Sequence, residues 1–269
     1  MDGRRQSFII YNIDQRLNWI IFQNNLVAED ILTSKSNNKV ALITGPAGNL
    51  GSAVVERFAA EGVSLILIDH HQDRLRKIYP KFNNSNDHLL ISSVDLTDSS
   101  AVKTAVQKAV DHFGQIDILV HTTGGFSMGE KVHETTGKTW DGMMNLNVKT
   151  LLNIASAVVP QMLEQKNGKI ITIGARPALA GKARMGSYSA AKTAVLRLTE
   201  SMSAELKSQG INVNCILPGT IDTPDNREVM PDADSSKWVT PDSLAEVILF
   251  LSSEAARDIH GAAIPVYGA

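Results

Sequence analysis

The sequence predicts one α/β domain built on a doubly wound parallel sheet, and three observations support this. A short apolar run, Val40–Thr44, is followed by a glycine-rich turn, a helix-like repeat and a second apolar run that ends before Asp69. Strand-like and helix-like segments then alternate as far as the C-terminus, the order that a parallel sheet covered on both faces requires. The chain of 269 residues is 43% hydrophobic with a formal net charge of -2, typical of a globular protein with a sizeable core.

The glycine-rich turn predicts a dinucleotide site in a Rossmann-like fold. Three glycines stand between the first strand and the first helix, so the N-terminus of that helix points beyond the edge of the sheet. Its unpaired N–H groups and its dipole favour a phosphate, and the glycines let the backbone approach it closely. The binding residues predicted in this turn are Gly45, Gly48, Asn49, Leu50 and Gly51.

Asp69, at the end of the second predicted strand, indicates which dinucleotide binds. A carboxylate about twenty residues after the glycines accepts hydrogen bonds from an adenosine ribose and repels a 2′-phosphate. The sequence therefore predicts NAD(H) as the cofactor in preference to NADP(H).

The remaining elements follow from hydrophobic periodicity. Further strands are predicted at residues 88–94, 116–121, 169–174, 211–217 and 262–266. Further helices are predicted at residues 99–113, 139–164, 186–209 and 241–252. No internal repeat or low-complexity segment interrupts the series, so one catalytic domain over residues 38–269 accounts for it.

Residues 1–37 lie outside this alternation and form a predicted N-terminal extension. Two apolar clusters, at residues 8–11 and 19–22, are separated by Asp14 and Arg16. No uninterrupted apolar stretch is long enough to span a bilayer, and no secretory leader is apparent. An arm packed on a partner subunit, a membrane-surface anchor and a leader remain open, and the arm is favoured.

Composition excludes several classes of partner. The charge balance gives no basic surface for nucleic acid. Cys215 is the only cysteine and lies in an apolar run, so we expect a buried thiol and no intramolecular disulfide, consistent with a reducing, cytoplasmic setting. The seven histidines show no helical ligand spacing, so no metal is predicted.

Tyr188 and Lys192 are the predicted catalytic pair. They are four residues apart in the predicted helix 186–209, so they share one face. A phenol with an ordinary pKa of about 10 is a poor acid–base catalyst at neutral pH. A neighbouring ammonium stabilises the phenolate and lowers that pKa. The same spacing occurs where a tyrosine packs at a helix edge beside a solvated lysine, but its place after the fifth strand of a dinucleotide fold favours catalysis.

An ordered set of motifs resembles the short-chain dehydrogenase/reductase family over residue 39 to the C-terminus. The set comprises Thr44-Gly45 with Gly48 and Gly51, Asp95, Asn147, Tyr188-x-x-x-Lys192 and Pro218-Gly219-x-x-x-Thr223. The resemblance implies that Tyr188 exchanges a proton with the substrate, that Lys192 holds the nicotinamide ribose, and that Asn147 supports a water relay behind Lys192. It implies further cofactor contacts at Asp95, Leu96, Thr123, Gly124, Tyr188, Lys192, Pro218, Gly219 and Thr223.

Three departures from the family pattern bear on activity. Asn49 stands where the family has glycine, and His121-Thr122-Thr123-Gly124 replaces Asn-Asn-Ala-Gly. The catalytic serine expected thirteen residues before the tyrosine falls on Ala175. Losing one such donor to the reacting oxygen costs about 2.7–4 kcal/mol in the transition state. Either the reaction does not need that donor, or the protein binds a nucleotide without turnover.

Several segments resemble the dihydropteridine reductase branch of the family, which likewise has alanine at the serine position and uses NADH. They include the glycine turn, Gly124-Gly125-Phe126, Gly174-Ala175 and the region from Leu217 to Trp238. This resemblance implies hydride addition to a delocalised imine-like ring, in which no localised alkoxide forms. Trp238 then either stacks on a flat heterocycle or anchors its loop. Arg176 either grips an anionic substrate or lies solvated at the surface.

Three functions follow as hypotheses. The first is an NAD(H)-dependent oxidoreductase of a small pterin-like or other conjugated heterocycle, with Tyr188 as proton donor. The second is a carbonyl or hydroxyl oxidoreductase similar to 3-oxoacyl reductases. The third is a non-catalytic nucleotide-binding protein. Apolar stripes on helices 139–164 and 186–209 predict a homodimer or homotetramer, through residues that include Leu151, Ile154, Ala155, Val158, Ala191, Val195, Leu198 and Met202.

Overall fold

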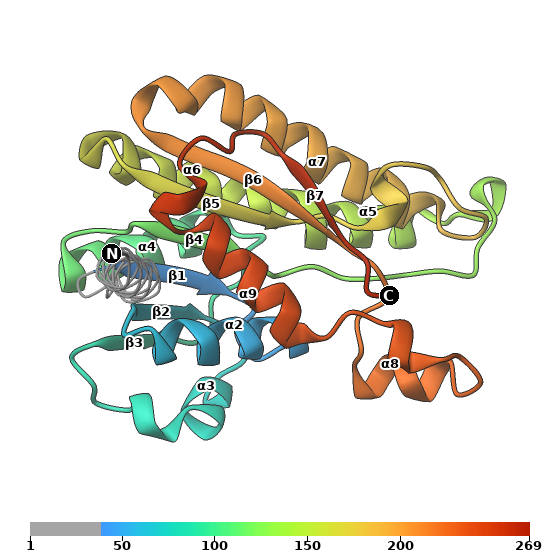
Figure 1. Ribbon diagram of the computed structural model, residues 1–269, viewed down its shortest axis with the longest axis horizontal. Helices are drawn as coiled ribbons and strands as arrows, with labels where there is room; N and C mark the ends of the chain where they lie inside the picture. Colours follow the sequence, from blue (N-terminus) through green and yellow to red (C-terminus); the bar gives the residue numbers. More distant parts are fainter. Residues whose placement is uncertain (1–38) are drawn as a thin grey trace, which may run out of the picture. The chain divides into compact units, whose positions relative to one another are not determined.

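Seven parallel strands form the centre of the computed structural model, which describes residues 39–269 (Figure 1). Their order across the sheet is β3-β2-β1-β4-β5-β6-β7, so the chain winds outward in both directions from β1 and β4. The strands are β1 (Val40–Thr44), β2 (Ser64–Ile68), β3 (His88–Ile91), β4 (Ile118–His121), β5 (Gly168–Ile173), β6 (Ile211–Pro218) and β7 (Ala263–Val266). The predicted extension, residues 1–37, lies outside the described residues.

Helices cover both faces of the sheet, because side chains alternate in direction along each strand. In β1, Ala41 and Ile43 pack with α2 (Asn49–Ala60) and α9 (Pro241–Leu251), whereas Val40 and Leu42 pack with α4 (Ser99–Phe113) and α6 (Thr150–Gln165). The doubly wound parallel sheet predicted from the sequence is confirmed. The helices are α2 (Asn49–Ala60), α3 (Arg74–Ile78), α4 (Ser99–Phe113), α5 (Gly137–Met144), α6 (Thr150–Gln165), α7 (Gly186–Leu206), α8 (Pro224–Val229) and α9 (Pro241–Leu251).

The helix predicted at residues 139–164 is helical throughout but is not an α-helix over its whole length. α5 and α6 are joined by a π-helical segment, Asn145–Lys149, in which the Thr150 N–H donates to the Asn145 carbonyl five residues back. Such π-helical turns are rare and are frequent at functional sites. The short helices α3 and α8 were not predicted, since neither carries enough apolar repeats to reveal its period.

The apolar stripes expected to join subunits are largely buried within the chain itself. Leu151, Ile154 and Val158 are fully buried within this chain, and Ala191 and Val195 are buried as well. Those side chains are buried within the chain itself and cannot contact a second subunit, whereas the joining of subunits by these helices stays a prediction. Periodicity identifies the buried face of a helix without saying what buries it.

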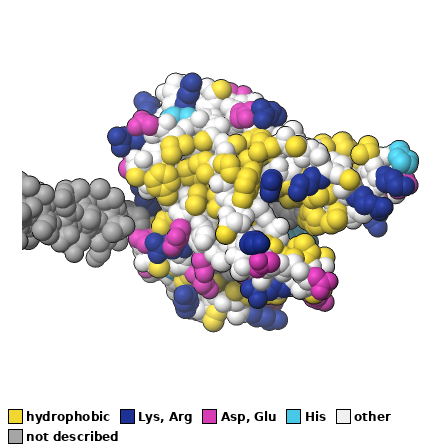
Figure 2. All heavy atoms as spheres, turned by 45° about the vertical axis from the view of Figure 1, so that its right-hand side comes forward, with side chains coloured by type: hydrophobic (Ala, Val, Ile, Leu, Met, Phe, Trp, Pro, Cys, Tyr) yellow, Lys and Arg dark blue, Asp and Glu magenta, His cyan; other side chains and the backbone are white. Residues whose placement is uncertain are grey.

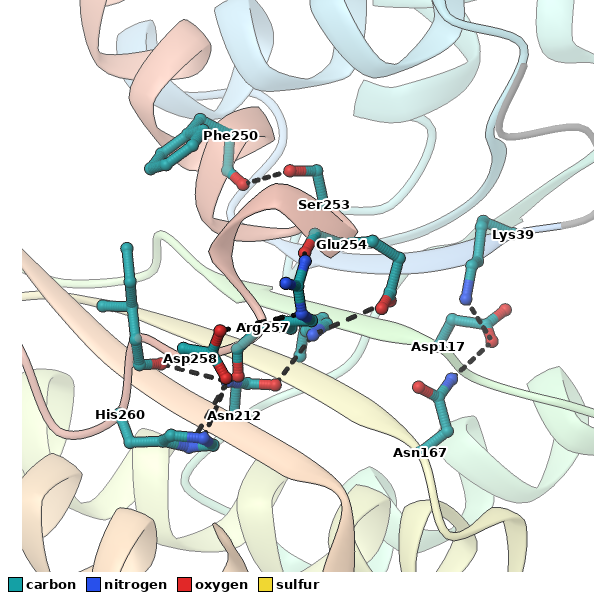
Figure 3. Close-up of polar contacts among 12 residues, drawn as sticks. Lys39, Asp117, Asn167, Asn212, Phe250, Ser253, Glu254, Arg257, Asp258 and His260 are labelled. Carbon is teal, nitrogen blue, oxygen red and sulfur yellow. Dashed lines mark hydrogen bonds and ion pairs between the residues drawn. The ribbon is translucent and has the colours of Figure 1, made fainter. Parts of the chain in front are cut away.

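Polar side chains fix the amino ends of the central strands, opposite the glycine turn (Figure 3). The Asp117 carboxylate accepts a hydrogen bond from the Val40 N–H at 2.8 Å, where β1 begins. The Lys169 ammonium donates to Asn212 Oδ1 at 2.7 Å, and Asn212 Nδ2 donates to the Arg257 carbonyl at 2.7 Å. These bonds align β1, β4, β5 and β6 and so fix where their carboxyl ends meet.

Within residues 39–269, none of the helices combines the length and the apolar run needed to cross a bilayer.

Candidate active site

The glycine turn has the geometry that the sequence predicts. Gly48 precedes the first residue of α2, and a Cβ at Gly51 would overlap the backbone of Gly45, so only glycine fits there. Two side chains near α3 hold the turn from outside: Tyr79 Oη donates to the Pro46 carbonyl at 2.6 Å, and Arg74 Nη2 donates to the Ala47 carbonyl at 3.1 Å. Sequence analysis missed both supports.

Two carboxylates lie at the carboxyl ends of β2 and β3. Asp69 is nearly buried, and its Oδ1 accepts a hydrogen bond from the His71 N–H at 2.8 Å. Asp95 Oδ1 accepts bonds from the Thr97 N–H and hydroxyl, each at 2.8 Å, and these bonds hold the pKa of Asp95 below its usual range. The neighbouring Leu96 carbonyl accepts from Asn153 Nδ2 at 2.9 Å. Both acids follow adjacent strands on the side of the sheet edge where the glycine turn opens.

The segment after β4 lies directly against the glycine turn. Thr122 Oγ1 donates to the Thr44 carbonyl at 2.6 Å, and the Thr123 N–H donates to Thr44 Oγ1 at 3.4 Å. The sequence placed Thr123 and Gly124 among the cofactor contacts, and the structure brings them to the same edge as Gly45.

Asn147 and Lys192 converge on the backbone of Gly124. A Cβ at Gly124 would lie 2.9 Å from Asn147 Oδ1 and 3.1 Å from Lys192 Nζ, so a side chain there would displace both. Asn147 also pairs with Gly125, accepting from its N–H at 3.1 Å and donating to its carbonyl at 3.2 Å. The π-helical segment therefore places Asn147 beside the predicted catalytic lysine, as the sequence suggested.

Lys192 is a buried ammonium with one fixed partner. Its Nζ donates to the Ile173 carbonyl, at the end of β5, at 2.9 Å. Burial lowers the pKa of Lys192 to about 8. The side chain is therefore mostly charged at neutral pH and readily loses its proton above that value.

Tyr188 lies on the same face of α7, with Lys192 Nζ 6.0 Å from its ring centroid. Burial raises the pKa of Tyr188 to about 12 in this structure. The sequence-based expectation that the lysine lowers this pKa is wrong here, because removal of water from the phenol dominates. Tyr188 is a protonated phenol at neutral pH.

Phe126 is the aromatic neighbour of Tyr188. The ring centroids are 4.9 Å apart at an interplanar angle of 82°, an edge-to-face contact, and Phe126 remains 57% exposed. Phe126 belongs to the motif Gly124-Gly125-Phe126, but no role in the site was predicted for it. The signal was available, since an aromatic residue directly after two glycines at the end of β4 can lie only over that edge of the sheet.

The predicted substrate residues are not all brought together. Ala175 is buried in extended backbone two residues after the end of β5, at the position where the family has serine. The Arg176 guanidinium carbon lies 5.1 Å from the centroid of the Tyr267 ring, a cation–π arrangement that directs the side chain toward the C-terminal segment. Trp238 is half-buried, with its backbone against Gly268, which favours the loop-anchoring interpretation.

The last predicted cofactor contacts follow β6. Pro218 ends that strand, and Gly219 packs against the Tyr267 backbone. Thr223 caps α8, its Oγ1 accepting from the Asn226 N–H at 3.1 Å. Cys215 is buried, as predicted from its apolar surroundings.

Comparison with known proteins identifies the class. Residues 39–234 match the family model described as short chain dehydrogenase. The chain is 32% identical to (2S)-[(R)-hydroxy(phenyl)methyl]succinyl-CoA dehydrogenase subunit BbsD of Thauera aromatica, over 86% of this chain and 96% of that protein. It is 29% identical to 3-oxoacyl-[acyl-carrier-protein] reductase FabG of Thermotoga maritima, again over 86% and 96%. The crystal structure of gox2181 superposes with a TM-score of 0.80 at 28% identity, covering 87% of this chain and 95% of that one.

The chain therefore belongs to the short-chain dehydrogenase family and is an oxidoreductase of small molecules. The family resemblance inferred from the ordered motifs is confirmed, and relatives named as dehydrogenases and reductases count against the non-catalytic alternative. The individual roles of the site residues remain proposals.

Proposed function

We propose that this protein binds NAD(H) at the carboxyl ends of its strands and catalyses hydride transfer to or from a small substrate, with Tyr188 as proton donor. The convergence of Asn147 Oδ1 and Lys192 Nζ on Gly124 carries the proposal. Thr123, one residue before Gly124, lies against the glycine turn, and Lys192 Nζ lies 6.0 Å from the Tyr188 ring centroid, so a phosphate site and a proton donor would share one edge of the sheet.

The residues present fit a nicotinamide dinucleotide. Gly45, Gly48, Asn49, Leu50 and Gly51 would hold its pyrophosphate at the N-terminus of α2. Asp69 would accept hydrogen bonds from the adenosine ribose, and Asp95, Leu96 and Thr123 would adjoin the adenosine half. Pro218, Gly219 and Thr223 would adjoin the nicotinamide. Bound there, the cofactor supplies or accepts the hydride.

Lys192 and Tyr188 have different roles in the proposed reaction. The ammonium has one donor committed to Ile173 and others free for a ribose hydroxyl. Tyr188 is protonated at neutral pH and so carries a proton for the reduced substrate, although burial raises its pKa and makes it a weaker acid than a solvated phenol. Asn147 fixes the Gly124–Gly125 backbone that forms the floor of this space.

A conjugated, pterin-like heterocycle is the substrate class that the site favours. Ala175 offers no hydroxyl to a developing alkoxide, and a delocalised ring needs none. The exposed Phe126 beside Tyr188 provides an aromatic surface for a flat ring. Hydrophobic side chains gather on the face that Figure 2 turns forward, and large exposed ones on the loops after β4 and β5 are Phe126, Met128, Val132 and Leu179.

A carbonyl or hydroxyl substrate is the second candidate, supported by the relatives. One is named for a hydroxyacyl-CoA dehydrogenase and the other for a 3-oxoacyl reductase. Because Ala175 has no hydroxyl, the oxygen of an acyl substrate of this type would need a hydrogen-bond donor from another residue. We further propose that the protein is a homodimer or homotetramer and that it acts in the cytoplasm. Light scattering on the purified full chain tests the oligomeric state.

The experiment that tests the function compares wild type with Tyr188→Phe. NADH oxidation is measured with quinonoid dihydropterin, quinones and short ketones or 3-oxoacyl thioesters, and NADH affinity is measured by fluorescence. We expect turnover by wild type, a loss of at least about 100-fold in the variant, and unchanged NADH affinity. Equal turnover by both proteins would remove Tyr188 from the mechanism.

A further inference from the structure

His121 is a buried histidine that the proposed chemistry does not use. It is the last residue of β4 and lies between two threonines from different elements. Its Nδ1 is 2.9 Å from Thr44 Oγ1, at the end of β1, and its Nε2 is 3.3 Å from Thr150 Oγ1, where α6 begins. Thr44 and His121 are also register partners in the sheet.

The contacts of Thr150 decide which ring nitrogen carries the proton. The Thr150 hydroxyl donates its only hydrogen to the Leu146 carbonyl at 2.8 Å. Its oxygen can then only accept from the histidine, so Nε2 must be protonated. A neutral ring leaves Nδ1 as an acceptor, and the Thr44 hydroxyl donates to it.

The hydrogen bond between the Thr123 N–H and Thr44 Oγ1 agrees with this assignment of donors and acceptors. Having donated its hydrogen to His121, Thr44 Oγ1 is free to accept from the Thr123 N–H at 3.4 Å. One continuous sequence of donors therefore runs from the Thr123 backbone through Thr44, His121 and Thr150 to the Leu146 carbonyl. No member needs a second proton.

The two ends of this sequence belong to the two halves of the site. Thr123 lies against the glycine turn, where a Cβ at Gly45 would touch Thr123 Oγ1 at 3.0 Å. Leu146 belongs to the π-helical segment, one residue before Asn147. Thr150 follows this segment directly, and its hydroxyl gives the Leu146 carbonyl, four residues back, a side-chain hydrogen bond.

We propose that His121 is a positioning residue that holds the π-helical segment bearing Asn147 in register with the glycine turn, as a neutral ring protonated at Nε2. Its consequence for turnover rests on the proposed function, whereas its tautomer does not. Burial and the nearby Lys192 ammonium both disfavour the imidazolium and lower the pKa of His121 to about 3, in accordance with this arrangement.

The first test is spectroscopic. Long-range ¹H–¹⁵N correlation spectra of the ¹⁵N-labelled full chain distinguish the two neutral tautomers, and the signal lost in His121→Phe assigns the ring. We expect the Nε2–H pattern, unchanged between pH 5.5 and 8. An Nδ1–H pattern, or a ring that averages between tautomers, would overturn the proposal.

The second test breaks the two hydrogen bonds of the His121 ring one at a time. Each variant replaces a threonine by valine, which removes the hydroxyl and leaves the shape of the side chain nearly unchanged. Thr150→Val removes the link to the π-helical segment and should lower kcat about 10- to 100-fold, the cost typical of misplaced catalytic groups, with little change in KM for NADH. Thr44→Val removes the link to the turn and should raise KM for NADH by a larger factor than it lowers kcat. These variants also keep the proposal testable if His121→Phe does not fold.

Thr172→Val is the matched control. Thr172 is the register partner of His121 in β5, and its hydroxyl is 2.7 Å from that of Thr199 in the core. We expect it to lose stability while kcat and KM stay at wild-type values. If Thr150→Val and Thr44→Val behave like this control, His121 is structural only and the proposal fails.

Failure of the proposed function can be distinguished from failure of the role proposed for His121. If wild type turns over no substrate with NADH, that function fails, but the tautomer spectrum and the NADH dissociation constant of Thr44→Val still decide the role of His121.

Discussion

The buried charge of Lys192 makes the stability of the protein depend on pH in a defined direction. Its pKa is lowered to about 8 in the folded state, whereas an unfolded lysine titrates near its model value of 10.5. Between these values the unfolded chain binds more protons than the folded one, so the free energy of unfolding rises with pH in that window. The full difference corresponds to about 3 kcal/mol, of which about 1 kcal/mol is gained between pH 7 and 9.

Replacing the charge should remove this dependence. We expect the free energy of unfolding of Lys192→Met, minus that of wild type, to fall by about 1 kcal/mol between pH 7 and pH 9. The lost bond to the Ile173 carbonyl adds an offset that does not change with pH, so the slope is the diagnostic quantity. Urea denaturation at pH 7, 8 and 9 measures it.

The matched control is Lys207→Met, since Lys207 is exposed at the end of α7. Its stability should run parallel to that of wild type over the same range. Parallel curves for wild type and Lys192→Met would refute the reasoning, because they would mean that the ammonium is not desolvated in the folded protein.

Three further predictions concern the proposed reaction. Asp69→Ala should shift the ratio of kcat/KM for NADH over NADPH toward NADPH by about 10- to 100-fold, because a hydrogen-bonding charge is lost; an unchanged ratio would remove Asp69 from cofactor selection. Ala175→Ser should leave the rate with a conjugated heterocycle unchanged or lower it, whereas a rise of about 100-fold on a ketone would favour the carbonyl alternative. Phe126→Leu should raise KM for a planar substrate about threefold to tenfold with kcat retained, as loss of one aromatic contact predicts; unchanged steady-state kinetics would place the substrate elsewhere.

The sequence was sufficient for the fold because the relevant signals are local. β1 and α4 have the predicted boundaries, since an apolar run or a helical repeat lies between clear stop signals. The sequence pattern did not reveal the π-helical segment within the predicted helix 139–164, because one extra residue per turn hardly disturbs an apolar stripe. α3 and α8 were missed because five or six residues cannot establish a period.

The site was predictable to the extent that it consists of motifs at fixed spacings. Tyr188, Lys192 and Asn147 were found in this way, and the structure brings Asn147 and Lys192 together on Gly124. The role of His121 depends on contacts between segments far apart in the chain, which spacing does not encode, whereas the position of Phe126 after two glycines could have been used. The polarity of Thr44 and Thr150 gave no signal either, because a threonine inside an apolar segment is most often satisfied by its own helix or strand.

The effect of burial on the catalytic pair bears on the direction of the proposed reaction. Desolvation favours the neutral form of each group, so it raises the pKa of Tyr188 to about 12 and lowers that of Lys192 to about 8. At neutral pH the pair is thus a phenol beside an ammonium, which is the state needed to give a proton to a substrate receiving hydride. Oxidation would require the phenolate, and the ammonium would have to turn from the Ile173 carbonyl toward Tyr188 to stabilise it. This protonation state fits the proposed reaction, in which Tyr188 gives its proton to a substrate that receives hydride.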